Sequence, residues 1–498
     1  MELLIAASLE SELDHSCTME LLAAFAFIAL CPLGVFVLPR MRPVQILLAV
    51  TVTGVVFGRY FFSVGPVSLD RLVLVGGLAA IVANVMRGTQ NSPRLHKMDI
   101  AVAGFTIWMC INSFLGTPPE GDPHPLNRWL FFVFLPSATY ALARFASVRP
   151  EDAKHFKYAI VGLGIYLAVT GVFEVLKLTP LVFPRYIMDP VHWEFLGRAR
   201  GPLLNPIGNG IYLTTVLAIG VYLWWYGKPN ERLMTSLLMG LLSLTILLTL
   251  TRSVWIGALL LVPVMLYLLR KQVLIPIGLF AIGGAALLVA VGPSVDLLAI
   301  KRDENLTAAD AANSVKLRPI LASIALDMFW DRPLVGHGYG CYLEASKPYV
   351  ASRNQELPLE IGRGYVQHNT YLAVLVDAGI IGLTLFVVIL ALTARMAWQL
   401  SQRGDHRRII GFAALGCLCS YFVNALFHDI GLIPLTNTLM LLLSGLVVTS
   451  TQELKNIAPF SSLGRRAADR ARAILKSRRV APGASLSSVA SSAKPGEA

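Results

Sequence analysis

Long apolar runs, separated by short polar connectors, make up most of this chain. The runs are about 17–25 residues long, the length that crosses the hydrocarbon core of a bilayer as an α-helix. A transmembrane β-barrel would instead require short strands of alternating polarity. The pattern therefore predicts an all-α, polytopic membrane protein with about 12–13 transmembrane helices. The expected spans are residues 21–38, 44–62, 69–86, 99–116, 129–145, 158–176, 207–226, 233–250, 254–269, 273–291, 367–394, 409–427 and 430–450.

Positive charge alternates between the connectors. Lys and Arg gather in every second connector and in the tail, whereas residues 63–68 and 117–127 contain neither. The positive-inside rule makes the basic connectors cytoplasmic and places the N-terminus outside. The first span contains Cys31-Pro32, and a re-entrant or kinked segment is the alternative there.

Two outer segments are longer than the other outer connectors, and they define the organisation of the chain. Residues 177–206 form the first, and residues 292–366 form the larger. Apolar residues at helical spacing over 310–330, ended by Arg332-Pro333, predict a partly helical loop domain. We thus expect an N-terminal segment, transmembrane helices that include the first outer segment, a large outer loop, C-terminal transmembrane helices, and a basic, largely disordered cytoplasmic tail. Their bounds are 1–20, 21–291, 292–366, 367–450 and 451–498.

Composition agrees with a membrane protein. Of the 498 residues, 55% are hydrophobic and 14% are charged, whereas soluble proteins contain about 25% charged residues. The net charge is +12, and the tail beyond Thr451 supplies half of it, with nine Lys and Arg against three Asp and Glu. Membrane orientation and contact with anionic lipid explain this balance without a nucleic-acid partner.

Arginines on the predicted outer side require an explanation, because positive charge is otherwise excluded there. Arg252 lies in a very short turn between two spans, where a guanidinium is costly unless it meets an anion or a wet cavity. A snorkelling side chain is the alternative. Arg318 lies on the predicted loop helix, where many residues simply face water.

His368 is the most prominent titratable group, because it stands at the mouth of the span 367–394. Asn369 follows it, and Gly379 and Gly382 lie deeper, where another helix can approach closely. A satisfied polar residue is the alternative reading of His368. His337, in the GHGYG segment, has the pattern of a turn residue.

Two other polar features carry less weight. His428-Asp429, in a tight outer turn, is a second polar contact ranked below His368. The sequence contains no HExxH, CxxC, P-loop or nucleophile elbow, so we expect neither a metal nor a cofactor.

Four motifs together resemble the signature of one known family. They are His368-Asn369 followed by Gly379-x-x-Gly382, DRPLVGHGYG at residues 331–340, RARGPLLNPIGNG at 198–210, and LTLTRSVW at 248–255. In this order they resemble the O-antigen ligase/polymerase family of bacterial membrane enzymes.

The resemblance implies a GT-C-like arrangement of helices and a metal-independent, inverting glycosyltransferase. Such an enzyme moves a glycan from undecaprenyl diphosphate to an acceptor hydroxyl at the periplasmic face of the inner membrane. It implies that Arg252, Arg318 and Arg198 bind the diphosphate and that His368 is the catalytic residue. Supporting roles are expected for the remaining candidates Arg200, Asn369, Arg363 and His337.

The resemblance leaves the acceptor open. A ligase uses lipid A-core, a polymerase uses another lipid-linked repeat unit, and a protein hydroxyl is a third option. We expect a ligase-type enzyme with the polymerase as the alternative. A secondary transporter or lipid-glycan flippase is the competing class, for which broken helices in matching halves would be expected.

Overall fold

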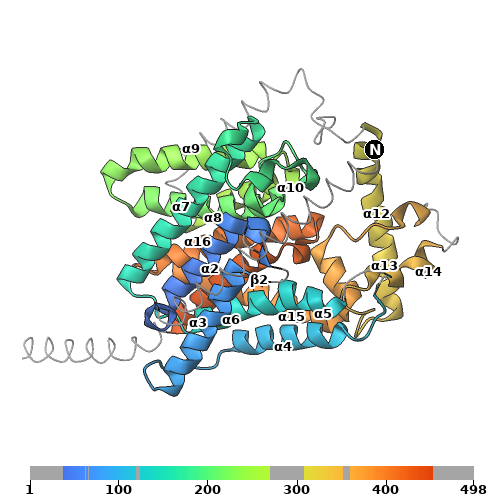
Figure 1. Ribbon diagram of the computed structural model, residues 1–498, viewed down its shortest axis with the longest axis horizontal. Helices are drawn as coiled ribbons and strands as arrows, with labels where there is room; N and C mark the ends of the chain where they lie inside the picture. Colours follow the sequence, from blue (N-terminus) through green and yellow to red (C-terminus); the bar gives the residue numbers. More distant parts are fainter. Residues whose placement is uncertain are drawn as a thin grey trace, which may run out of the picture. The chain divides into compact units, whose positions relative to one another are not determined.

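A computed structural model describes residues 37–61, 63–64, 67–118, 120, 124–269, 308–351 and 359–452 of the chain (Figure 1). The chain divides into two compact units, Met1–Ser450 and Thr451–Ala498, of which the first is considered below. The predicted span 273–291, nearly all of the span 21–38, the N-terminal segment 1–20 and all but the first residues of the tail 451–498 lie outside the described residues.

The described part of the chain is almost entirely helical. Two strands, β1 (Ser63–Val64) and β2 (Val67–Ser68), form a small antiparallel pair. The helices are α2 (Pro43–Phe61), α3 (Leu69–Met86), α4 (Lys97–Asn112), α5 (Pro125–Trp129), a π-helical segment (Leu130–Phe134), α6 (Leu135–Arg144), α7 (Pro150–Val175), α8 (Pro206–Tyr226), α9 (Arg232–Leu248), α10 (Arg252–Leu268), α12 (Ala308–Asp331), α13 (Tyr342–Ala345), α14 (Lys347–Val350), α15 (Thr370–Ser401), α16 (Arg408–Phe427) and a last helix, Pro434–Gln452.

These helices confirm the predicted class of an all-α, multi-pass membrane protein. Seven helices in the described residues are long and apolar enough to cross a membrane, and α10 and most of α2 are shorter apolar helices. Every predicted span that falls within the described residues coincides with a helix. The agreement is physical: each helix satisfies its own backbone hydrogen bonds, which a lipid environment requires.

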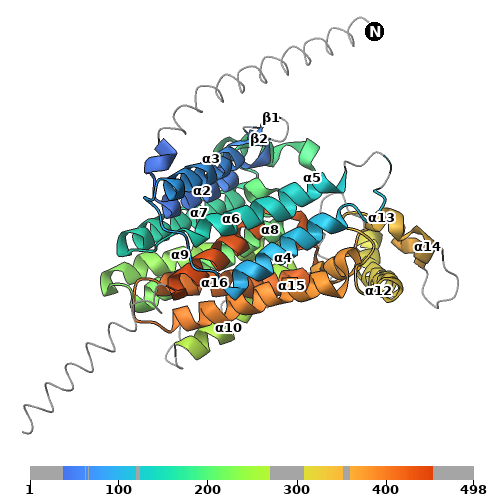
Figure 2. The same cartoon turned by 90° about the horizontal axis from the view of Figure 1, so that it is seen from below.

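Helices α8 and α16 form the centre of the bundle. Of the residues in their most apolar stretches, 83% and 89% are buried, against 22% for α3. Small residues permit this close packing, because a side chain at Gly416 would overlap Ala218 and one at Gly257 would approach the Ser420 backbone at 2.9 Å. Helix α16 thus packs against α8, α10 and α15, which lie side by side with it in Figure 2.

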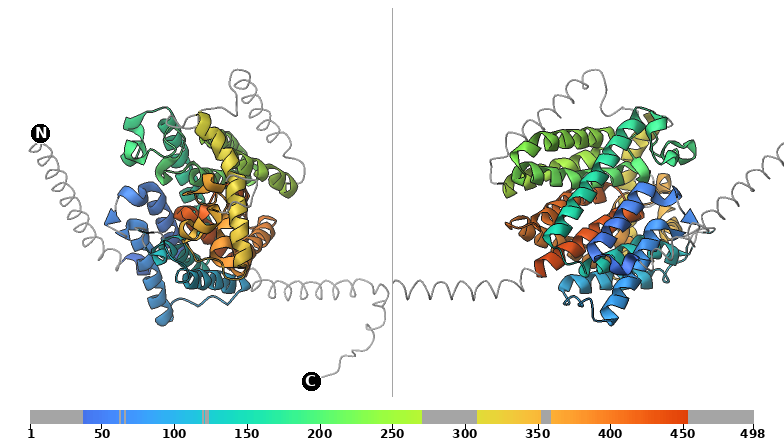
Figure 3. Two further views of the ribbon diagram at one scale, coloured as in Figure 1. Left: turned by 90° about the vertical axis from the view of Figure 1, so that its right-hand side faces the viewer. Right: turned by 60° about the vertical axis from the view of Figure 1, so that its left-hand side comes forward.

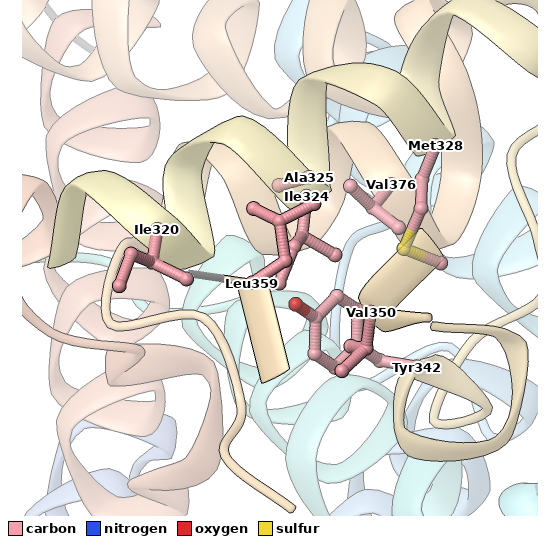
Figure 4. Packing of buried hydrophobic residues seen from close by; sticks show 8 residues of the cluster. All are labelled: Ile320, Ile324, Ala325, Met328, Tyr342, Val350, Leu359 and Val376. Atoms are coloured by element: carbon pink, nitrogen blue, oxygen red, sulfur yellow. The ribbon is translucent and has the colours of Figure 1, made fainter. Parts of the chain in front are cut away.

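Helix α12 lies across one end of the bundle, as Figures 1 and 3 show. The apolar spacing that predicted this helix corresponds to its buried side. Ile320, Ile324 and Met328 pack against residues from α13, α14 and α15, including Tyr342 and Val376 (Figure 4). The predicted loop helix is therefore confirmed, and it is attached to the start of α15.

A kink at Gly379 shapes α15 two turns below its start. Gly379 has φ +66° and ψ −169°, and a side chain there would overlap the carbonyl of Leu334. The Ile380 N–H donates to the Pro333 carbonyl at 2.8 Å. The close approach expected at Gly379 is thus made by the loop that follows α12, whereas at Gly382 the neighbour is Trp108 of α4.

Candidate functional site

The start of α15 positions His368. Asn369 caps the helix, since its Oδ1 accepts a hydrogen bond from the Leu372 N–H at 3.0 Å. The Asn369 Nδ2 also donates to the carbonyl of Leu426, at the end of α16, at 3.0 Å. Asn369 therefore fixes the backbone next to His368 to a neighbouring helix, which is a positioning role.

Thr370 strengthens the same junction between α15 and the turn after α16. Its hydroxyl donates to the His428 carbonyl at 2.8 Å and accepts from the Ile430 N–H at 2.9 Å. As a result, His368 and His428, which are 60 positions apart in the sequence, are carried on two segments joined by hydrogen bonds.

Arg252 begins α10 directly after a tight turn from α9. The turn is closed locally, because the Thr251 hydroxyl donates to the Thr249 carbonyl at 2.9 Å and the Trp255 indole N–H donates to the Ile246 carbonyl at 3.0 Å. The N-terminus of a helix carries partial positive charge, so a guanidinium there adds to a field that attracts anions. Beside it, the Ser253 hydroxyl forms a hydrogen bond with Nε2 of His428 at 3.0 Å.

The charge of Arg318 acts on groups at the start of α10 and at the start of α15. Loss of surrounding water and the positive charge of Arg252 lower the pKa of the Arg318 guanidinium. Its guanidinium carbon stands 5.6 Å from the ring centre of Phe427, the last residue of α16. The structure therefore brings Arg318, from the loop helix, close to Arg252, from the α9–α10 turn.

His368 belongs to the same group. Partial burial of its ring, together with the positive charge of Arg318, lowers the pKa of His368 from its usual 6.5. We name Arg252, Arg318, His368 and His428 the cationic cluster. The guanidiniums of Arg252 and Arg318 repel each other, so an anion bound between them would relieve that repulsion.

The segment that carries Arg198 and Arg200 is held in place by a buried ion pair. The Arg200 Nε donates to Glu174 Oε1 of α7 at 2.8 Å, and both side chains are fully buried. The other carboxylate oxygen accepts the N–H groups of Arg200 and Gly201 at 2.9 and 2.8 Å. The rest of the guanidinium donates to carbonyls of the same segment, those of Ile187, His192 and Glu194. Arg200 thus anchors this segment.

Arg198 lies next to that anchor. Its side chain is buried and stands over the Phe195 ring at 5.2 Å. The adjacent Ala199 N–H donates to the carbonyl of Leu248 at 3.0 Å, four positions before Arg252. The segment that carries Arg198 is therefore tied by this bond to the turn that precedes Arg252.

Two further candidates have other surroundings. His337 is buried, its Nε2 is 2.7 Å from the Met328 carbonyl, and its ring meets that of Tyr349 edge-on. Burial lowers the pKa of His337. Its main contacts hold the GHGYG turn against α12, as its turn-residue pattern suggested. Arg363 has an exposed side chain in the loop that precedes α15.

The sequence ranked His428 below His368, and the structure adds a contact of His428 that the sequence did not predict. The signal was present, since a His-Asp pair occupies a tight turn next to an apolar span. Only the contact with Ser253 reveals that this turn lies against the start of α10.

The fold and the cluster together define a class: a multi-pass membrane protein with arginine and histidine side chains gathered where helix ends meet. Comparison with known proteins makes this specific. Residues 237–387, which contain Arg252, Arg318 and His368, match the family model described as O-antigen ligase. An O-antigen ligase of Pseudomonas aeruginosa is 25% identical over 322 residues, which are 63% of this chain and 67% of that protein.

Both matches are to O-antigen ligases, so the resemblance to the O-antigen ligase/polymerase family seen in the motifs is confirmed. Members of the family are glycosyl-transferring enzymes, and the assignment supports a role in the assembly of O-antigen or another cell-surface glycan.

Proposed function

We propose that this protein is a glycosyltransferase of the O-antigen ligase type. In this proposal, it transfers a glycan from undecaprenyl diphosphate to an acceptor hydroxyl at the periplasmic face of the bacterial inner membrane. The observation that carries the proposal is that the segments of Arg252, Arg318 and His368 meet at the end of α16. Arg318 stands over Phe427, Asn369 bonds the Leu426 carbonyl, and Ser253 bonds His428.

The arginines would bind the diphosphate of the donor. Guanidinium groups stay charged and offer paired N–H donors that match phosphate oxygens. The N-terminus of α10 adds backbone N–H groups at Arg252. The bond from the anomeric carbon to the diphosphate oxygen breaks in the reaction, so negative charge grows where these groups lie. Because the guanidiniums supply that charge stabilisation, we expect transfer without a metal ion.

His368 would act as the general base. Its lowered pKa keeps the imidazole neutral near pH 7, ready to accept a proton. The acceptor oxygen attacks the anomeric carbon opposite the diphosphate, and its proton passes to His368. Undecaprenyl diphosphate leaves, and the configuration at the anomeric carbon is inverted. The bound diphosphate also stabilises the imidazolium that forms.

Lipid A-core is the acceptor that we favour, because the matched relative is named an O-antigen ligase. A polymerase would use the same donor, and therefore the same arginines, with a lipid-linked repeat unit as acceptor. A deletion strain separates the two. Loss of a ligase leaves long chains on the lipid carrier, whereas loss of a polymerase leaves single repeats.

The direct test is transfer by purified protein in nanodiscs from a defined undecaprenyl-diphosphate glycan to lipid A-core. Arg252→Ala should lower the rate about 10²–10³-fold, and His368→Ala about 10²–10⁴-fold. Arg403→Ala is the matched control, since Arg403 is exposed in the loop after α15. A chelator should leave the rate unchanged, and NMR of the product should show an inverted anomeric centre. Full activity in either cluster variant, at normal protein level, would refute the assignment.

A further inference from the structure

A cavity that contains polar groups lies next to the cationic cluster, on the same two backbone segments. Gln367 precedes His368, and Asp429 follows His428. Whereas the histidines belong to the cationic cluster, Gln367 and Asp429 both line a cavity whose other walls come from α4, the α5–α6 region, α15 and the last helix. The volume that the centre of a water molecule can reach in this cavity is about 100 Å³.

The cavity contains polar groups whose bonding capacity is unused. Gln367 is only 3% exposed, and its Nε2 has no hydrogen-bond partner among the residues that the structure describes. In the same part of the chain, Asp377 Oδ1 also lacks a partner, while its Oδ2 accepts from the Gly340 N–H at 3.3 Å. A buried amide or carboxylate without a partner is destabilising, so a ligand or ordered water is expected to complete these bonds.

Charge selects the kind of ligand. Asp377 and Asp429 repel each other, and Arg128 attracts both. Burial raises the pKa of Asp429 to about 7, so near neutral pH this carboxyl group is partly protonated and can donate as well as accept. These groups suit a neutral polar ligand better than a second diphosphate. A lipid tail would leave the carboxylates and the Gln367 amide unsatisfied. Hydroxyl groups fit, because they can donate to the carboxylates and accept from the amide N–H.

Shape and lining agree with a sugar ring. Phe105 and Tyr339 also line the cavity, and aromatic side chains offer apolar faces on which the C–H groups of a pyranose can pack. An apolar cavity of about 150 Å³ holds one benzene ring. The cavity here, at about 100 Å³, is smaller, so it can take up no more than one ring, and the rest of the glycan would lie outside.

We propose that this cavity binds one pyranose ring of the acceptor, with Gln367 and Asp377 as the groups that recognise its hydroxyls. The inference rests on the proposed function for the identity of the acceptor. In-line displacement requires the acceptor to approach the anomeric carbon from the side opposite the diphosphate. Gln367, which lines the cavity, and His368, which belongs to the cationic cluster, are consecutive residues, so a ring bound in the cavity would lie next to the residue proposed as general base.

Sugar binding can be measured without transfer. We would record saturation-transfer NMR on the full chain in nanodiscs with free glucose, galactose, N-acetylglucosamine and rhamnose. At least one of these should bind the wild-type protein, and Gln367→Leu and Asp377→Asn should each weaken that binding about ten-fold. Gln402→Leu and Asp405→Asn, in the loop region after α15, are the matched controls. Thermal unfolding, monitored by fluorescence, verifies that each variant is folded. If Asp377→Asn fails to fold, Gln367→Leu alone provides the test.

Kinetics then test which substrate the cavity serves. Gln367→Leu should raise the KM for the acceptor about ten-fold and leave the KM for the donor unchanged. A raised donor KM, equal sugar binding by variants and wild type, or no binding of any sugar by the wild type would each overturn the inference. If no transfer is detected but sugar binding is present and is lost in the variants, the cavity assignment stands and the proposed function fails.

Discussion

Removal of Glu174 should be among the most damaging single changes in the described part of the chain. In Glu174→Ala, Arg200 keeps its charge but loses the carboxylate that accepts its Nε–H at 2.8 Å. The N–H groups of Arg200 and Gly201 lose the same partner. Both members of the pair are 0% exposed, so water cannot replace the missing carboxylate.

The magnitude follows from that burial. Breaking a buried ion pair by removing one partner costs about 3–5 kcal/mol, whereas replacing both partners by apolar side chains is often neutral. We therefore expect Glu174→Ala to lower the free energy of unfolding by about 3–5 kcal/mol. Glu174→Leu combined with Arg200→Met should recover much of that loss.

The assay is denaturant unfolding of purified protein in detergent, with donor KM measured in parallel. Because the Arg200 segment carries Arg198 and the Ala199–Leu248 hydrogen bond, the donor KM should rise in Glu174→Ala. Glu231→Ala is a control, since that glutamate is exposed. A loss below about 1 kcal/mol, or a double variant no more stable than the single one, would refute the argument.

Three further predictions concern α15 and its start. Gly379→Ala should destabilise the protein by about 1–3 kcal/mol, because the position has φ +66° and no space for a side chain; in an unfolding assay Gly404→Ala, which meets open space, should change little. Asn369→Ala should cost about 1 kcal/mol through the lost cap, should also lose the bond to the Leu426 carbonyl, and should lower transfer further. Asn369→Asp should keep the cap and lose only the bond to Leu426, so its loss of stability should be smaller; equal loss in both would contradict the capping role. The lowered pKa of His368 keeps it neutral to lower pH, so kcat/KM should fall only as pH drops through a value below 6.5. Arg318→Gln removes a positive charge near His368, so the pKa of His368 should rise. The activity that remains in this variant should therefore begin to fall at a higher pH than in the wild type. An unchanged pH dependence would exclude the electrostatic coupling.

The sequence alone determined the fold class and the main members of the cluster. A run of apolar residues long enough to cross a bilayer must form a helix, because lipid offers no partner for its backbone; the limits of α3, α8 and α16 therefore agree with the expected spans. The apolar side of α12 was visible in the same local way, through Ile320, Ile324 and Met328. Motifs around Arg252, Arg318 and His368 singled out the residues that the structure brings together.

Tertiary structure alone decided what surrounds each polar residue. Periodicity reports which face of a helix is apolar, but not which distant group meets a given side chain. Arg200 and Arg252 look alike in the sequence. In the structure, Arg200 forms a buried ion pair with Glu174, whereas Arg252 belongs to the cationic cluster. Asp377 is an acidic residue within an apolar span, and only the packing of α15 against the GHGYG turn gives it the cavity that it shares with Gln367. Such pairings depend on the three-dimensional packing of segments far apart in the chain, to which a local pattern is blind.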